Sequence, residues 1–296
     1  MIRIALFLAS IVLLALLFGA RSADSRAADP IRVEWLTNEA AAHARAADAA
    51  LEAAETLMRE ATDEARRGQA AVLGGADDPT AALEAAGLGF EAAATPLADA
   101  HAALVMLGWT LRAIDLQESS PQLGLLPADL VDVGAQWRAA ALPSAALTDM
   151  RRQAESTLEA LDDGLAALDA DDPAAALDAM DRATGYLEQV RDFQVSDFEG
   201  QEVSTLGYWV DTVDALIDAA RAIAHAAQAG DAAALATAQA AYDAAAANAV
   251  RADQALTIAL GEAATGITSP ASASSAAALR AVGAARDQLA GLSILR

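Results

Sequence analysis

Small side chains recur at alternating four- and three-residue steps in the first long segment of this chain, and this spacing leaves few folds open. The repeating positions are Ala40, Ala44, Ala47, Leu51, Ala54, Met58, Ala61 and Ala65. A heptad pattern of this kind places its members on one side of a helix. Because most members carry only a methyl group, the pattern predicts helices that pack at close range. No comparable segment shows the period-two alternation of a half-buried strand.

A second heptad pattern follows a turn at residues 74–79. Its leading positions are Leu83, Phe90, Leu97, Leu104 and Leu111, with Gly87, Ala94, His101 and Gly108 expected at the alternate seam positions. Pro96 interrupts this helix, but the seven-residue phase continues through it, so we expect a kink and not a new element. Leucine-rich stripes continue to the C-terminus, and the fold class is therefore predicted to be all-α.

Four stretches break the helical periods and divide the chain. They are a connection at 117–128, a Pro-Ser break at 143–144, an irregular segment at 192–202 and a Pro/Ser-rich flexible linker at 266–275. With these breaks we predict an elongated antiparallel bundle of seven or eight helices. The expected organisation is a signal peptide or anchor at 1–28, a helical hairpin at 29–116, a bundle continuing the same core at 117–265, and a linker with a final helix at 266–296.

The N-terminal segment resembles an export signal in its chemistry. Residues 4–20 contain no charge, Arg3 precedes them, and small residues follow. This pattern is typical of a cleaved secretory signal, and the same run sits at the lower length limit for a membrane-spanning helix. Membrane insertion through residues 4–20 therefore stays open as the alternative to cleavage. Either outcome places the rest of the chain outside the cytoplasm, as a periplasmic or secreted protein.

The charge balance excludes several classes of partner. The chain has 42 acidic and 19 basic residues, a formal net charge of −23, and no lysine. Such a surface repels phosphate backbones and anionic lipid headgroups, so nucleic-acid binding is not expected. Cysteine is absent, which excludes disulfides, thiolate metal sites and thiol nucleophiles.

An acidic Asp-Asp-Pro triplet occurs at residues 77–79 and again at 171–173, and a Gly-Asp pair occurs at 230–231. Aspartate before a helix accepts hydrogen bonds from unpaired amide groups, and proline suits the first helical position. A calcium loop would need more oxygen ligands at regular spacing. We therefore interpret these acids as helix N-caps and expect no metal site.

Two places offer ligand-binding chemistry. His101 falls on the predicted seam near Glu55, where a buried imidazole beside a carboxylate could bind a metal or accept a proton, although a structural role is commoner. The region around 192–209 combines aromatic rings with acids, which could stack on sugars or surround a cation, or could simply fill the end of an alanine-walled bundle. Its candidates are Phe193, Phe198, Glu199, Glu202, Tyr208 and Trp209.

The catalytic repertoire is small. The chain has three histidines, no cysteine and no lysine, and it lacks a glycine-rich phosphate loop and a nucleophile elbow. We therefore expect no catalytic residues and no cofactor. The leading hypothesis is an extracytoplasmic helical scaffold or interaction subunit with protein partners in the cell envelope or a membrane assembly. The alternative is an extracytoplasmic solute- or metal-binding helical protein.

Overall fold

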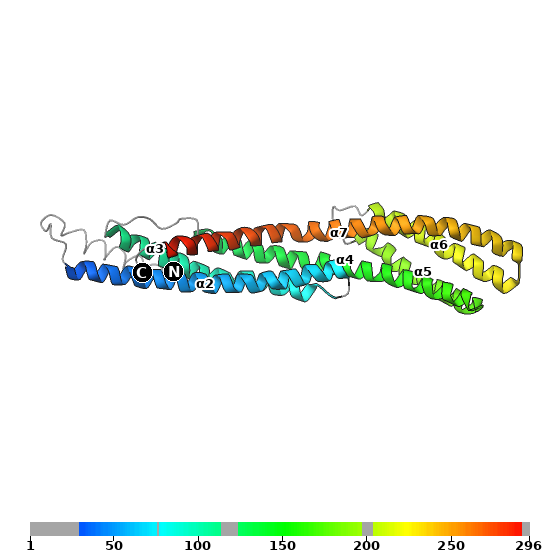
Figure 1. Ribbon diagram of the computed structural model, residues 1–296, viewed down its shortest axis with the longest axis horizontal. Helices are drawn as coiled ribbons and strands as arrows, with labels where there is room; N and C mark the ends of the chain where they lie inside the picture. The colour runs from blue at the N-terminus through cyan, green and yellow to red at the C-terminus, as the bar shows by residue number, and fades with distance from the viewer. Residues whose placement is uncertain (1–29, 76, 114–123, 197–203, 292–296) are drawn as a thin grey trace.

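The described part of the chain is a long helical rod. The computed structural model describes residues 30–75, 77–113, 124–196 and 204–291. These residues form six helices and no strand: α2 (Pro30–Gly74), α3 (Thr80–Ala113), α4 (Leu126–Asp169), α5 (Pro173–Ser196), α6 (Ser204–Ala229) and α7 (Ala232–Ala290). Figure 1 shows them running along the rod axis, with the start of α2 and the end of α7 in the left-hand part of the picture. The predicted all-α bundle is confirmed.

Among the described residues the helices number six and not seven or eight, because two expected breaks are helical. Pro143 lies inside α4, and Pro270 lies inside α7, which continues through the whole of 266–275. The break predicted at 143–144 and the linker predicted at 266–275 are therefore wrong. Thr268 and Ser275 lie buried in this stretch and donate hydrogen bonds to carbonyls one turn earlier, to Ala264 at 3.0 Å and Ala271 at 2.7 Å. Burial of small side chains thus outweighs the weak helical preference of proline and serine.

Helix also covers parts of the two remaining connections. α4 begins at Leu126, inside the connection predicted for 117–128, and α5 continues to Ser196, inside the irregular segment predicted for 192–202. Residues 114–123 and 197–203 lie outside the described residues, as does the predicted signal or anchor segment at 1–28.

The rod consists of two four-helix bundles joined end to end (Figure 1). The first bundle contains α2, α3, the first half of α4 and the last half of α7. The second contains the last half of α4, α5, α6 and the first half of α7. Trp137 of α4 belongs to the first core and Leu147 to the second, so the segment 117–265, predicted to continue one core, contributes to two. Of the described helices, only α4 and α7 extend through both bundles.

The small-residue seam of α2 is buried as predicted. All eight positions from Ala40 to Ala65 are 3% exposed or less. On α3 the leading positions Leu83, Phe90, Leu97 and Leu104 are also buried. The alternate seam positions differ, however, because Ala86, Ala93, Ala100 and Leu107 occupy them in place of Gly87, Ala94, His101 and Gly108. His101 therefore lies one residue off the core line.

Gly87 of α3 instead faces α4, where it meets Gly134. A Cβ atom added to Gly134 would lie 2.6 Å from the Gly87 carbonyl oxygen, and one added to Gly87 would lie 2.7 Å from the Gly134 carbonyl oxygen. Real Cβ atoms essentially never approach other atoms so closely. The two backbones are thus in direct contact, and Arg138 pairs with Glu91 beside this contact.

The acidic corners cap helices. The Asp172 carboxylate accepts a hydrogen bond from the Ala175 amide, with Pro173 as the first residue of α5. The Asp231 carboxylate accepts from the amides of Ala233 and Ala234 at the start of α7. In the first corner Asp78, the predicted cap, accepts from the Thr80 amide, and α3 begins at Thr80, one residue later than predicted. These bonds confirm the capping interpretation.

Candidate functional surfaces

Titratable side chains do not converge in the part of the chain that the structure describes. No group of three or more histidines, aspartates or glutamates within these ranges is arranged to hold a metal ion. The carboxylates mostly line the helix surfaces, where many pair with arginines. The remaining features that could carry a function are individual side chains, such as His101 and Trp209, and surfaces of the rod.

His101 is half-buried beside the start of α4. A Cβ atom added to Gly124 would lie 3.0 Å from the ring, so the imidazole packs closely against the Gly124 backbone. The His101 Nδ1 atom is buried and has no hydrogen-bond partner. Glu55, its predicted neighbour, instead pairs with Arg59 and Arg286. The described surroundings of His101 thus supply packing contacts and no ion pair.

The aromatic candidates of the 192–209 region point in different directions. Trp209 is completely buried in the second core, and its indole nitrogen has no hydrogen-bond partner. Its neighbour Tyr208 is 50% exposed, and Phe193 is half-buried against the same core. Phe198, Glu199 and Glu202 lie outside the described residues. The three described rings fill and flank the core, and they do not surround a common space.

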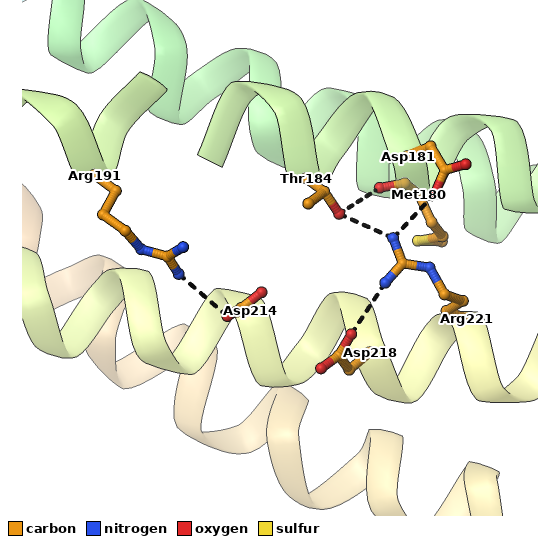
Figure 2. A network of polar contacts seen from close by, with 7 residues as sticks. All are labelled: Met180, Asp181, Thr184, Arg191, Asp214, Asp218 and Arg221. Atoms are coloured by element: carbon orange, nitrogen blue, oxygen red, sulfur yellow. Dashed lines mark hydrogen bonds and ion pairs between the residues drawn. The ribbon is translucent and has the colours of Figure 1, made fainter. Parts of the chain in front are cut away.

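Arginine-centred ion pairs fasten α5 to α6, as Figure 2 shows. Arg221 of α6 donates to the Asp181 carboxylate at 3.1 Å and to the Thr184 hydroxyl at 3.0 Å, both on α5. Arg191 of α5 donates to the Asp214 carboxylate of α6 at 3.2 Å. Solvent-exposed pairs of this type contribute roughly 0–1 kcal/mol each. Their role is to set the register of two helices, and they leave these acids unavailable to a ligand.

The outer face of α3 is apolar and exposed. Leu88 and Trp109 are 58% and 59% exposed, and Val105 is 38% exposed. Between residues 86 and 111 the only titratable side chains are Glu91, Asp99 and His101. A helix that is apolar on both its core side and its outer side is usually covered by a partner. We define the outer face of α3 as the surface carrying Leu88, Val105 and Trp109.

A groove between α4 and α7 is the second surface feature. Its volume is about 500 Å³. Its lining residues on α4 are Leu125, Leu126, Asp129, Asp132, Val133 and Gln136, and those on α7 are Ser274, Ala277, Ala278 and Ala281. The α7 side of the groove carries only small side chains, whereas the α4 side carries two acids. We call this feature the α4–α7 groove.

The outer face of α3 and the α4–α7 groove contain none of the site residues predicted from the sequence. The low charge along 86–111 is a weak signal for the outer face of α3, because residues 254–279 are poorer still in charge, with Glu262 as their single titratable residue. The α4–α7 groove leaves no such signal, since it depends on how α7 is placed relative to α4.

Comparisons with known proteins give no family for this chain: no family model, no curated protein and no solved structure matches it. Within the described ranges, no helix combines the length and apolar character that a membrane span requires.

Proposed function

We propose that the protein is an extracytoplasmic, non-catalytic helical scaffold that binds protein partners in the cell envelope or a membrane assembly. The observation that carries the proposal is the exposed apolar outer face of α3, with Leu88, Val105 and Trp109 on a helix almost free of charge. Large aromatic side chains of this kind are the residues that contribute most to protein–protein affinity.

The shape of the molecule supports the same role. α7 alone has 59 residues, which corresponds to a helix roughly 90 Å long. The start of α2 and the end of α7 lie toward one end of the rod, and the turns after α4 and α6 lie at the other (Figure 1). A rod held at its termini would display its sides and its far end to partners. The apolar run at residues 4–20 supports export or anchoring at that end.

Site-specific photo-crosslinking in the native host tests the interaction role. A photoreactive amino acid at Leu88 or Trp109 should give covalent adducts with a defined protein, because both side chains are exposed on the outer face of α3. The matched control is Thr56, an exposed position on the charged side of α2. Equal adduct yields at Trp109 and Thr56, or no adducts at Leu88 and Trp109, would remove the support for the proposal.

Cysteine labelling tests the location separately. The natural chain has no cysteine, so Thr56→Cys creates a single reporter. A membrane-impermeant maleimide should modify this variant in intact cells, or in intact cells with a permeabilised outer layer. Labelling that appears only after complete lysis would place the rod in the cytoplasm and contradict the extracytoplasmic part of the proposal.

A further inference from the structure

In the first bundle α7 packs against α2 as well as α4, and its α2 contacts lie on the side away from the α4–α7 groove. On that side of α7, Leu279 contacts the first core, and Arg286 pairs with Asp48 and Glu55 of α2. Ser272 adds a hydrogen bond, since it accepts from the Gln69 amide nitrogen at 2.8 Å. These contacts draw α7 against α2 and leave its opposite side without large side chains.

The α7 wall of the groove consists of Ser274, Ala277 and Ala281, with Ala278 at the floor. The two helices meet directly beside the groove, where the Trp137 indole donates to the Ser275 hydroxyl at 2.9 Å, and the small side chains of α7 leave a hollow at the surface next to this contact. Small residues on a helix surface allow another helix to approach at short range, as they do in the α2 seam of this same protein. The α7 wall is thus shaped to accept a helix.

The α4 wall is acidic. Asp129 and Asp132 have no ion pair among the described residues, as is true of most of the described acids, so their carboxylates are free to pair with a basic partner. Asp129 lies in the first turn of α4, where it also favours the positive helix end. Asp132 lies beyond that turn, so helix stability does not explain its position. Leu125, 72% exposed, lies beside these acids at the groove mouth.

From these contacts we propose that the α4–α7 groove binds an amphipathic helix of a partner protein that carries arginine or lysine along one edge. The apolar ridge of this helix packs on Ala277 and Ala281, and its basic edge pairs with Asp129 and Asp132. The groove wall from Leu125 to Gln136 spans roughly 17 Å, which corresponds to about three helical turns. Apolar contacts at i, i+4 and i+7 fit this length.

Charge decides between this occupant and a second copy of the chain. With 42 acidic and 19 basic residues, two copies repel each other, whereas a basic helix is attracted by the field of the whole rod. The groove lies on a different side of the first bundle from the outer face of α3, because the α4–α7 contact does not involve α3. The inference therefore goes beyond the proposed function and can be tested without it.

A peptide-display selection on the purified full chain tests the proposal. The library consists of 14-residue helical peptides with leucine or alanine fixed at i, i+4 and i+7 and with Arg, Lys, Gln or Glu varied at the flanking positions. Selected peptides should be enriched in Arg and Lys along one edge only. Their affinities are then measured by fluorescence anisotropy against groove variants.

Two groove variants and two matched controls distinguish the outcomes. Ala277→Trp fills the groove and should abolish binding, whereas Ala276→Trp, on an exposed neighbouring position outside the groove, should not. The double change Asp129→Asn and Asp132→Asn should weaken binding about tenfold, since each pair contributes up to about 1 kcal/mol. The control for net charge changes Asp211 of α6 and Asp253 in the first half of α7 to Asn, because both acids are exposed and neither lines the groove.

The proposal is overturned if no peptide is selected, if binders show no basic edge, or if Ala277→Trp leaves their binding unchanged. It is also overturned if the Asp211 and Asp253 control weakens binding as much as the groove acids do, because the attraction would then come only from the overall charge. Circular dichroism of each variant checks that the rod remains folded. These measurements use purified protein, so they stand whether or not the rod is extracytoplasmic.

Discussion

Replacing glycine by alanine should have opposite effects on stability at two helical glycines, Gly134 and Gly185. Gly134 is in close contact with α3, whereas Gly185 has free space around it. Gly134 lies inside α4 and is buried, and an added Cβ would lie 2.6 Å from the Gly87 carbonyl oxygen and 2.8 Å from the Glu91 side chain. Gly185 lies inside α5, is exposed, and an added Cβ would have no neighbour within 4 Å. The two sites therefore differ in packing and share the same helical backbone.

Replacing glycine by alanine inside a helix removes backbone freedom from the unfolded chain and gains roughly 0.5–1 kcal/mol. Gly185→Ala should show this gain in the free energy of unfolding. At Gly134 the same gain is opposed by overpacking, which typically costs about 1–3 kcal/mol. The obstructing atom is a backbone oxygen of α3, so the clash is relieved only if the helices separate. Gly134→Ala should therefore lose about 1–2 kcal/mol.

Urea denaturation followed by circular dichroism measures both changes under identical conditions. The expected difference between the two variants is about 2–3 kcal/mol, with Gly134→Ala below the natural protein and Gly185→Ala above it. If Gly134→Ala proved as stabilising as Gly185→Ala, α3 and α4 could not be in backbone contact. The arrangement of the first bundle would then be wrong at this point.

Three further changes test other parts of the rod. Trp137→Phe removes the indole hydrogen bond to the Ser275 hydroxyl, which measures 2.9 Å, and should lower the free energy of unfolding by about 1–2 kcal/mol in urea denaturation. Asp231→Ala removes the cap of α7 and should cost about 1 kcal/mol in the same assay, whereas no loss would show the cap to be unimportant. Burial and then the nearby Asp162 raise the pKa of Tyr242 above its ordinary value of 10.0, so the folded state favours the neutral phenol. This contribution is complete below pH 10 and is lost as the pH rises through the raised pKa, so natural protein should lose stability relative to Tyr242→Phe above pH 10.

The parts of the fold that depend on local pattern are predictable from the sequence. The α2 seam from Ala40 to Ala65 is such a part, because a regular heptad of small residues has one way to lie on a helix. The caps at Asp172 and Asp231 are another, since the chemistry of a helix start involves only neighbouring residues. From these features the sequence predicts the all-α class and the start of two helices, α5 and α7.

The parts that depend on contacts between distant segments are not predictable in the same way. Pro143 and Pro270 predict helix breaks from the sequence. Helices α4 and α7 nevertheless continue through these prolines, because neighbouring residues such as Ser144 and Ala271 are buried against the other helices. His101 lies one residue off the core line because Ala86, Ala93 and Ala100 occupy that line, while Gly87 faces Gly134 of α4. The α4–α7 groove depends on how α7 is placed between α2 and α4, through contacts such as Arg286–Glu55 and Trp137–Ser275 that join residues far apart in the sequence.

The continuity of α7 is the central structural claim, because α7 is one of the two helices that join the bundles. The chain has no cysteine, so Thr237→Cys and Arg280→Cys, both at exposed positions of α7, provide clean sites for two spin labels. An unbroken helix separates these positions by roughly 65 Å, and double electron–electron resonance should give one narrow distribution near that value. A broad distribution centred at clearly shorter distances would show that residues 266–275 are a flexible linker and that the two bundles do not form one rod.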